Sequence, residues 1–262
     1  MDSINRLKNK WILITGATSG IGKASAVLFA ESGTNLIITG RRNDRLQTLQ
    51  KSLIKEHGVE VITRCFDVRD RDECKKAIQE IKHPIDILLN NAGLAVGTDP
   101  IYSGKFDDWD RMIDTNIKGL LTMTRFISAQ MKERNEGHII NIGSIAGHEA
   151  YPGGVTYAAT KHAVNAITKA TKMDLHGSNV RVSAVSPGLV DTEFSEVRYY
   201  GDREKADKVY EDMKPLKAED IAEIILFVAN RPPHVNIMDT IVFPVQQSAA
   251  TMVHQSSGSV DD

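Results

Sequence analysis

Apolar residues along this chain fall into two alternating patterns: short continuous runs, and longer segments in which they recur every three to four residues. Continuous runs of this length are typical of strands buried on both faces, whereas the longer period predicts helices with one apolar face. The predicted strands cover residues 11–15, 35–39, 59–66, 85–89, 137–143, 180–186 and 239–243. The predicted helices cover residues 23–31, 43–57, 69–82, 106–131, 156–176 and 219–229.

The order of these elements, with helices between successive strands, favours a parallel sheet with right-handed crossovers. We therefore expect an α/β fold, a doubly wound Rossmann sheet of about seven strands with helices on both faces. No shift in composition divides the chain, so residues 1–255 are expected to form a single domain. The small polar residues of 256–262 are expected to form a disordered tail.

The charge balance narrows the classes of partner. The net charge of −2 gives the chain no basic field of the kind that binds nucleic acid or membrane surfaces. No apolar run reaches the length of a membrane span, and residues 1–10 lack the apolar core of a signal peptide. The two cysteines, Cys65 and Cys74, suit neither a disulfide framework nor a metal site, and they indicate a reducing, cytoplasmic compartment. Cys65 is expected to be a small buried residue in its strand.

A glycine-rich turn joins the first predicted strand to the first predicted helix. Gly16, Gly20 and Gly22 have the spacing G-x-x-x-G-x-G. Glycines let the backbone turn tightly and approach a pyrophosphate, and the following helix offers unpaired N–H groups and the positive end of its dipole. The turn therefore predicts a dinucleotide site rather than a plain connection.

The end of the second predicted strand bears on which dinucleotide is bound. Enzymes that bind NAD usually carry an acid here for the ribose 2′-hydroxyl. This strand ends instead in Gly40, Arg41 and Arg42, and no carboxylate appears before Asp44. Arginine pairs with a 2′-phosphate, whereas an acid repels it, so the sequence favours NADP. Two solvated arginines in a loop are the plain alternative.

Tyr157 and Lys161 lie four residues apart in the helix predicted at 156–176, so they share one helix face. A free phenol has a pKa near ~10 and is a poor acid and base at neutral pH. A lysine cation beside it favours the phenolate and lowers that pKa. The pair therefore predicts proton transfer, with an ordinary exposed helix face as the alternative.

Two further polar residues lie where a ligand is expected. Ser144 follows the strand predicted at 137–143, and open α/β sheets bind ligands beyond the carboxyl ends of their strands. A plain turn serine is the alternative. Asn116 lies in the middle of the helix predicted at 106–131, where a core-side amide needs hydrogen-bond partners.

Taken together, these motifs resemble those of the short-chain dehydrogenase/reductase family, over about residues 10 to 245. Within that family the chain is similar to the branch of NADP-dependent 3-hydroxy acid dehydrogenases, which act on serine, allo-threonine and related small acids. The finer match rests on Gly40-Arg41-Arg42, Asp174-Leu175-His176-Gly177, Pro187-Gly188-Leu189-Val190, Val197-Arg198 and His234-Val235-Asn236-Ile237, among others.

The resemblance implies a role for each motif residue. Tyr157 would be the general acid in carbonyl reduction, and Lys161 would lower its pKa and hold the nicotinamide ribose. Ser144 would bind the carbonyl oxygen, and Asn116 would fix a water that leads to Lys161. The implied NADP(H) contacts, beside Tyr157 and Lys161, are Gly16, Ser19, Gly20, Ile21 and Gly22 at the pyrophosphate, Arg41 and Arg42 at the 2′-phosphate, Asp67 and Val68 at adenine, Asn91 at the ribose, and Pro187, Gly188, Val190 and Thr192 near the nicotinamide.

The family places a mobile lid at about residues 191–214, and here that segment carries several cations. An arginine binds a carboxylate or sulfonate bidentately, so a small anionic substrate would explain one of them. Arg198 is our choice, because it lies closest to the catalytic end, and with Ser144 and Tyr157 it completes the expected substrate contacts. His148 and Tyr151 are weaker candidates. The remaining lid cations, Arg203, Lys205 and Lys208, are expected on a solvated face.

The predicted enzyme interconverts a small 3-hydroxy acid and its oxo form with NADP(H) and needs no metal. A sulfoacetaldehyde reductase on the same scaffold, a 3-oxoacyl thioester reductase and a non-catalytic NADP sensor remain the alternatives. The family usually forms homotetramers through two long helices, here at about 106–135 and 154–176. Apolar positions there that exceed the needs of one sheet face include Leu120, Leu121, Met123, Phe126, Ile127, Ala163, Ala166 and Ile167, although core packing alone would account for them.

Overall fold

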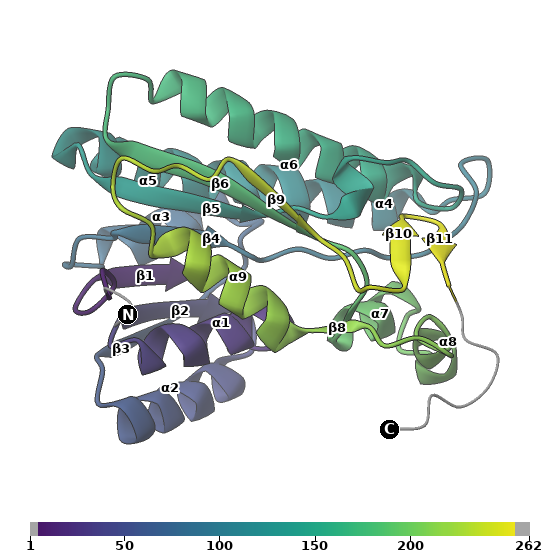
Figure 1. Ribbon diagram of the computed structural model, residues 1–262, viewed down its shortest axis with the longest axis horizontal. Helices are drawn as coiled ribbons and strands as arrows, with labels where there is room; N and C mark the ends of the chain where they lie inside the picture. Colours follow the sequence, from purple (N-terminus) through teal and green to yellow (C-terminus); the bar gives the residue numbers. More distant parts are fainter. Residues whose placement is uncertain (1–4, 255–262) are drawn as a thin grey trace.

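A seven-stranded sheet, parallel throughout, runs through the middle of the molecule (Figure 1). The computed structural model describes residues 5–254, so the predicted tail at 256–262 lies outside the described residues. The strands, in their order across the sheet, are β3 (Val61–Cys65), β2 (Asn35–Gly40), β1 (Trp11–Ile14), β4 (Ile87–Asn90), β5 (Gly137–Ile142), β6 (Val180–Pro187) and β9 (Asp239–Val242). The chain thus adds β2 and β3 on one side of β1, and then β4 and the later strands on its other side. This change of side between β1 and β4 is what the predicted Rossmann fold requires.

Helices cover both faces of this sheet (Figure 1). One face carries α1 (Gly20–Glu31), α2 (Asn43–His57) and α9 (Ala218–Ala229). The other carries α3 (Arg71–Gln79), α4 (Phe106–Ile113), α5 (Leu120–Arg134) and α6 (Val155–Asp174). No helix among residues 5–254 is both long and apolar enough to span a membrane.

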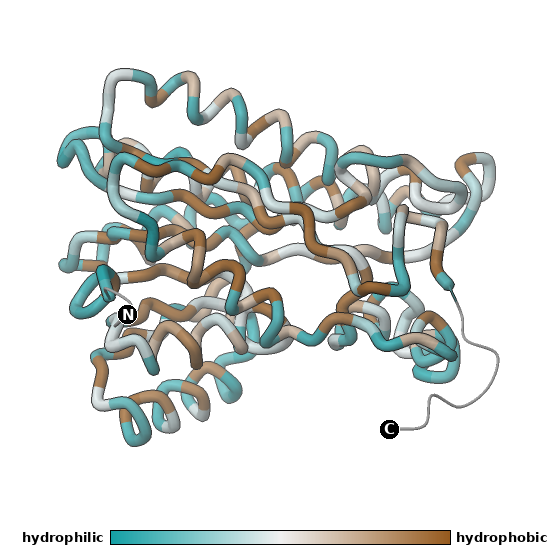
Figure 2. The backbone as a smooth tube through the Cα atoms, in the orientation of Figure 1, coloured by the Kyte–Doolittle hydropathy of each residue, from teal (hydrophilic) through white to brown (hydrophobic). Residues whose placement is uncertain are grey.

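The two cores follow from the alternation of side chains along each strand. Ile12 and Ile14 of β1 pack with Phe29 of α1 and with α9, whereas Leu13 packs with Met123 of α5 on the opposite face. Figure 2 shows the apolar residues concentrated along the strands and the polar ones along the outer turns. Because both faces are covered, the strands read as continuous apolar runs, which is the pattern that revealed them.

Single residues set where two of the helices begin or end. Gly58 ends α2 in the left-handed conformation (φ 65°), directly after the predicted helix end at residue 57. Asp70 starts α3 because its carboxylate accepts hydrogen bonds from the amides of Asp72 and Glu73. The predicted start of that helix at residue 69 is therefore two residues early, and its predicted end at residue 82 lies beyond Gln79.

One long helix was predicted over 106–131, but the structure interrupts it. A π-helical turn, η1 (Asp114–Gly119), separates α4 from α5, which continues to Arg134. A π turn widens the helix by one residue and occurs often at functional sites. Asn116 lies in this turn.

Cys65 is exposed, against our prediction that it is buried. It is the last residue of β3, which pairs only with β2 at the edge of the sheet. An edge strand is covered less completely than the central ones, and only Val61 of β3 is buried. Cys74, in α3, is fully buried.

Short elements gather at the carboxyl end of the strands (Figure 1). The segment predicted as a lid forms two short helices, α7 (Glu193–Arg198) and α8 (Arg203–Lys208). The flanking strands β7 (Val190–Asp191) and β8 (Leu216–Lys217) pair with each other and close this segment into a loop attached to the sheet. A last hairpin, β10 (Gln247–Ala249) and β11 (Met252–Val253), lies beside it.

Candidate active site

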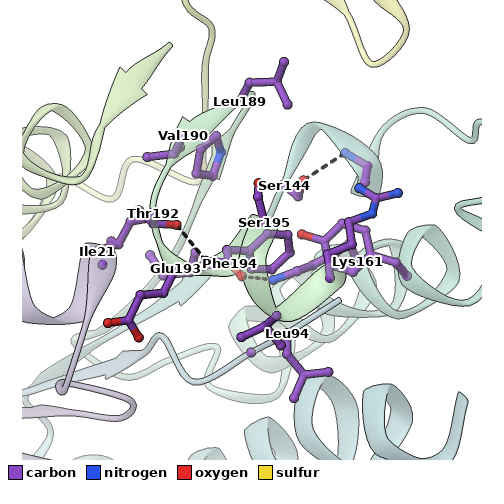
Figure 3. Close-up of a pocket in the computed structure, with 18 of the residues that line it drawn as sticks. Ile21, Leu94, Ser144, Lys161, Leu189, Val190, Thr192, Glu193, Phe194 and Ser195 are labelled. Carbon is purple, nitrogen blue, oxygen red and sulfur yellow. Dashed lines mark hydrogen bonds between the residues drawn. The ribbon is translucent and has the colours of Figure 1, made fainter. Parts of the chain in front are cut away.

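A cleft of about 390 Å³ opens at the carboxyl ends of the four central strands. Each strand contributes the residues that follow it: Gly16 after β1, Asn91 after β4, Ser144 after β5 and Gly188 after β6. The lid segment forms the remaining wall (Figure 3). The predicted residues that line the cleft are Gly16, Ser19, Gly20, Ile21, Arg41, Asn91, Ser144, Tyr157, Lys161, Pro187, Gly188, Val190, Thr192 and Arg198.

The remaining predicted residues do not line the cleft. Gly22 is buried beneath the glycine turn, and Val68 packs in the core. Asp67 pairs with Arg69 at 2.7 Å, with Arg41 3.8 Å away. Asn116 and Arg42 also support wall residues rather than line the cleft.

The glycine turn is packed tightly against Asn91. A Cβ atom on Gly22 would lie 2.4 Å from Asn91 Nδ2 and 2.5 Å from the carbonyl oxygen of Gly16, so a side chain does not fit there. Asn91 Nδ2 donates to the carbonyl oxygens of Thr15 (2.9 Å) and Gly16 (3.1 Å). The Thr15 hydroxyl accepts from the amides of Asn91 and Ala92. The turn is thereby fixed to the end of β4.

Arg42 lies between the glycine turn and the lid. Its Nε and Nη2 donate to the Thr18 hydroxyl, and Nη2 also donates to the Ser19 hydroxyl at 2.9 Å. Its Nη1 pairs with Glu193 at 2.9 Å. Arg41 is half-exposed beside the same turn. The guanidinium groups and the Ser19 hydroxyl thus provide donors suited to an anionic group next to the turn.

Tyr157 and Lys161 both lie on the buried face of α6, with 9% and 6% of their surfaces exposed. Lys161 Nζ is 5.8 Å from the centre of the Tyr157 ring and donates to the carbonyl oxygen of Ile142 at 2.8 Å. The Phe194 ring of the lid lies 5.6 Å from the Tyr157 ring, centre to centre. The predicted pair is therefore inside the cleft rather than on an exposed helix face.

Burial dominates the acid–base properties of this pair. It raises the pKa of Tyr157 above its ordinary value, and the Ser144 hydroxyl and the Arg198 cation offset this only in part. Burial also lowers the pKa of Lys161 from 10.5 to about 8. We predicted that Lys161 lowers the pKa of Tyr157. The net change has the opposite sign, because burial of the phenol outweighs its neighbours and the Lys161 ammonium is directed at Ile142.

Ser144 lies at the turn that follows β5. Its hydroxyl accepts from the amide of Ala146 at 3.1 Å and caps the 3₁₀ turn η2 (Ile145–Gly147). Asn116 is buried and fully bonded. Its amide group bonds to both the N–H and the C=O of Leu94, and to the Thr160 hydroxyl. These contacts supply the partners that a core asparagine requires and join η1 to α6.

The lid carries Arg198 into the cleft. The Arg198 Nε atom is buried and has no hydrogen-bond partner among the described residues. Its guanidinium carbon lies 5.6 Å from the centre of the Tyr151 ring, and its backbone oxygen accepts from the amide of Gly97. The other lid cations pair with exposed acids, as expected for a solvated face: Arg203 with Glu196, Lys205 with Asp202 and Lys208 with Glu204.

Known proteins share both the sequence and the fold. A family model described as short chain dehydrogenase matches residues 10–200. The chain belongs to the short-chain dehydrogenase family. "NADP-dependent 3-hydroxy acid dehydrogenase YdfG" of Salmonella typhi is 48% identical over 250 residues, which cover 94% of this chain and 99% of that protein. "NADP-dependent 3-hydroxy acid dehydrogenase" of Schizosaccharomyces pombe is 43% identical over 256 residues, 96% of this chain and 99% of its own.

A solved structure of serine dehydrogenase in its closed form, complexed with NADP+, superposes on this short-chain dehydrogenase with a TM-score of 0.88. It is 44% identical, and the match covers 94% of this chain and all of that one. The predicted family and the Rossmann fold are thereby confirmed.

The structure adds cleft residues of this short-chain dehydrogenase that sequence reasoning missed. Thr18 and Glu193 bond to Arg42. Phe194 faces Tyr157. Gln247 lines the cleft from the C-terminal hairpin, where its Oε1 accepts from the amide of Leu189 at 2.8 Å. No motif or periodic pattern in the sequence marks Gln247, because it follows the last predicted strand.

His148 was a weaker substrate candidate, and its ring is directed away from the cleft. Its Nε2 lies 3.3 Å from the Ser186 hydroxyl and 3.6 Å from an Asp239 oxygen, between β6 and β9. Tyr151, the other weaker candidate, does line the cleft.

Proposed function

We propose that this protein interconverts a small anionic 3-hydroxy acid, of the serine, allo-threonine or 3-hydroxypropionate type, and its oxo form with NADP(H). Its relatives of that name match along almost the whole chain, which supports NADP(H) as the cofactor and a CH–OH group as the site of reaction. The observation that carries the choice of an anionic substrate is Arg198, which lines the cleft of Ser144 and Tyr157 with a buried, unpartnered Nε.

The described residues fit NADP(H). The turn at 16–22 excludes a side chain at Gly22 and opens the N-terminus of α1 to the cleft, as a pyrophosphate requires. Arg41 and Arg42 supply cationic donors for a 2′-phosphate, and Ser19, expected at the pyrophosphate, lies beside them with its hydroxyl 2.9 Å from Arg42 Nη2. When bound, this cofactor exchanges a hydride with the carbon that bears the substrate oxygen.

Ser144 and Tyr157 act on that oxygen. The amide of Ala146 holds the Ser144 hydroxyl at the end of β5, so the hydroxyl can donate to the substrate oxygen and stabilise its developing negative charge. Burial keeps the Tyr157 phenol protonated at neutral pH, so it holds the proton that carbonyl reduction requires, while Ser144 and Arg198 lower its pKa and so ease the transfer. In the oxidative direction the phenolate form of Tyr157 must accept the proton of the substrate hydroxyl, and the nearby Lys161 cation stabilises that phenolate.

Arg198 holds the acid group of the substrate. A guanidinium binds a carboxylate or a sulfonate through two parallel hydrogen bonds, and burial strengthens both. Since the cation is on the lid, an anion in the cleft also draws α7 towards Tyr157. A sulfonate such as that of sulfoacetaldehyde has the same charge and one more oxygen, which the Tyr151 hydroxyl would serve.

A substrate panel tests the proposal. The full chain is incubated with L-serine, 3-hydroxypropionate or isethionate, each with NADP+ and with NAD+, and reduced cofactor is followed by absorbance. We expect turnover with NADP+ and a carboxylate. Preference for isethionate would assign a sulfoacetaldehyde reductase instead. Cofactor binding without turnover of any acid would contradict the proposal and favour the non-catalytic sensor.

We also propose a homotetramer, formed through α5 and α6. Met123 and Ile127, two of the apolar positions that suggested this interface, are fully buried in the core and unavailable to a partner. Leu121 and Val155 remain exposed, at 44% and 47%, and supply apolar surface on the same helices. Sedimentation of the full chain measures the assembly, and a monomer would contradict it.

A further inference from the structure

A carboxylate of the lid rests on Arg42, one of the two arginines that the cofactor's 2′-phosphate is expected to bind. Glu193, the first residue of α7, pairs through Oε2 with Arg42 Nη1 at 2.9 Å and through Oε1 with Arg45 Nη1 at 2.7 Å. Figure 3 shows Glu193 on the side of the cleft near Ile21, away from Lys161. This double ion pair ties the lid to the start of α2.

The contacts of Arg42 leave little room for a second anion. Its Nη1 bonds to Glu193, while its Nε and Nη2 bond to the hydroxyls of Thr18 and Ser19. Burial alone would raise the pKa of Glu193, but hydrogen bonds from Arg42 and Arg45 outweigh it and hold the pKa below its ordinary value. Glu193 is therefore ionised at neutral pH, and a phosphate beside Arg42 would meet a like charge.

The same residue begins the helix that reaches the catalytic groups. Thr192 caps α7 by accepting from the amide of Phe194. The Phe194 ring lies against Tyr157, and Arg198 ends the helix. α7 has only six residues, so Glu193 at its start and Arg198 at its end lie within two helical turns. The ion pair at Arg42 therefore holds the same short helix that carries Arg198 to the substrate side of the cleft.

We propose that Glu193 competes with the 2′-phosphate of the cofactor for Arg42, so that binding of the phosphate releases α7 from α2. Glu193 then has two roles. It sets how strongly the protein selects for a 2′-phosphate, and it holds the lid in place until that phosphate arrives. The inference rests on the proposed NADP(H) specificity but is independent of the substrate.

The first test compares two nucleotides that differ in the 2′-phosphate alone. Binding of adenosine 2′,5′-bisphosphate and of 5′-AMP to the full chain is measured by titration calorimetry. Glu193→Gln removes the competing charge, so it should bind the bisphosphate roughly five- to tenfold more tightly and leave 5′-AMP unchanged. Glu196→Gln, on the same helix but paired with Arg203, is the matched control and should change neither.

Two results would overturn the competition. Weaker binding of the bisphosphate by Glu193→Gln would mean that Glu193 helps to form the phosphate site. An equal gain in affinity for both nucleotides would mean that the substitution does not act through the 2′-phosphate. If the wild type shows no preference for the bisphosphate while Glu193→Gln acquires one, the NADP(H) assignment fails and the role of Glu193 stands. Hydroxy-acid turnover enters neither measurement.

The second test follows the lid itself by hydrogen exchange of the amides at 193–198. In the wild type, adenosine 2′,5′-bisphosphate should speed their exchange and 5′-AMP should not, because only the former displaces Glu193. In Glu193→Gln these amides should exchange fast from the start, with no further change. Slower exchange in the wild type on addition of the bisphosphate would show that the phosphate fixes α7 in place, and would contradict competition with Glu193.

Discussion

At the scale of single residues, Arg198 is the most decisive position. Arg198→Ala removes the cation that we assign to the substrate's acid group, and charge-assisted hydrogen bonds are worth roughly 1.5–3 kcal/mol. The KM for the acid should therefore rise about 10- to 100-fold. Steady-state kinetics at saturating NADP+ measure this change.

The matched control is Arg203→Ala, on the same lid. The Arg203 side chain is 81% exposed and pairs with Glu196, so its loss should leave the KM unchanged. Both variants should bind NADP+ as the wild type does. An unaltered KM in Arg198→Ala would remove Arg198 from the site.

Lys161 makes stability depend on pH in an unusual direction. Below about pH 8 the lysine is charged in both the folded and unfolded chains, and the folded state bears the full cost of the buried cation. Between about 8 and 10.5 the folded chain loses this proton while the unfolded chain keeps it, so stability rises with pH.

Relative to Lys161→Met, the wild type should therefore gain roughly 3 kcal/mol of unfolding free energy across that window. Urea unfolding of both proteins at several pH values measures the difference, which cancels the other titrating groups. Parallel pH profiles would show that the pKa of Lys161 is the same in the folded and unfolded chains.

The sequence predicted those site residues that belong to short motifs. Gly16, Ser144, Tyr157 and Lys161 sit in motifs of fixed spacing, and the structure brings them to one cleft. Glu193 escaped notice because its partner Arg42 is far away in the chain, and only the fold brings the two together. The sign of the Tyr157 pKa shift was also beyond the sequence, since it depends on how completely the ring is buried.

At the scale of elements, the glycine turn and α1 form a unit that a single methyl group should disrupt. Gly22→Ala places a Cβ against the backbone of Gly16 and the amide of Asn91. We expect at least roughly tenfold weaker NADP+ binding, because the turn must open to relieve the contact. Fluorescence titration measures the affinity.

Gly58→Ala separates this effect from stability in general. Gly58 has φ 65° and no heavy atom near its missing Cβ, so alanine there should cost about 1–2 kcal/mol of unfolding free energy. Cofactor affinity should remain that of the wild type. Equal affinities in Gly22→Ala and Gly58→Ala would mean that the turn tolerates the methyl group.

Element type was easier to predict than element ends. Every strand of the seven-stranded sheet was predicted from its apolar run, including the edge strands β3 and β9, which are only partly buried. The ends depend on single hydrogen bonds such as the Asp70 cap of α3, and the apolar pattern over 106–131 did not reveal the π turn at Asp114–Gly119. The short lid helices have six residues each, too few for a period to be recognised.

At the scale of the whole molecule, the sheet should open from its edges. β1 and β4 are paired on both sides and covered by helices on both faces, whereas β3 and β9 each have one neighbour. Native-state hydrogen exchange should therefore be slowest at the amides of β1 and β4 and faster in β3 and β9. Uniform protection across the sheet would indicate that it opens only by global unfolding.

The parallel, doubly wound arrangement of the strands was predicted from their alternation with helices, without any knowledge of side-chain contacts. The C-terminal hairpin could not be placed in the same way. β10 and β11 are very short, and their position beside the lid depends on long-range hydrogen bonds such as that from Leu189 to Gln247.

The place of β1 between β2 and β4 also bears on how a ribosome delivers this protein. β2 follows β1 in the chain, so one side of β1 pairs early, while its other side waits for β4. During that interval a fully apolar strand presents an open edge, the kind of surface that chaperones protect. Glu193 emerges about 170 residues after Gly22, which at roughly 5–20 residues per second is about 10–30 s later. A nucleotide that needs both walls of the cleft can therefore stabilise only the finished chain, and early misfolding must be prevented by other means.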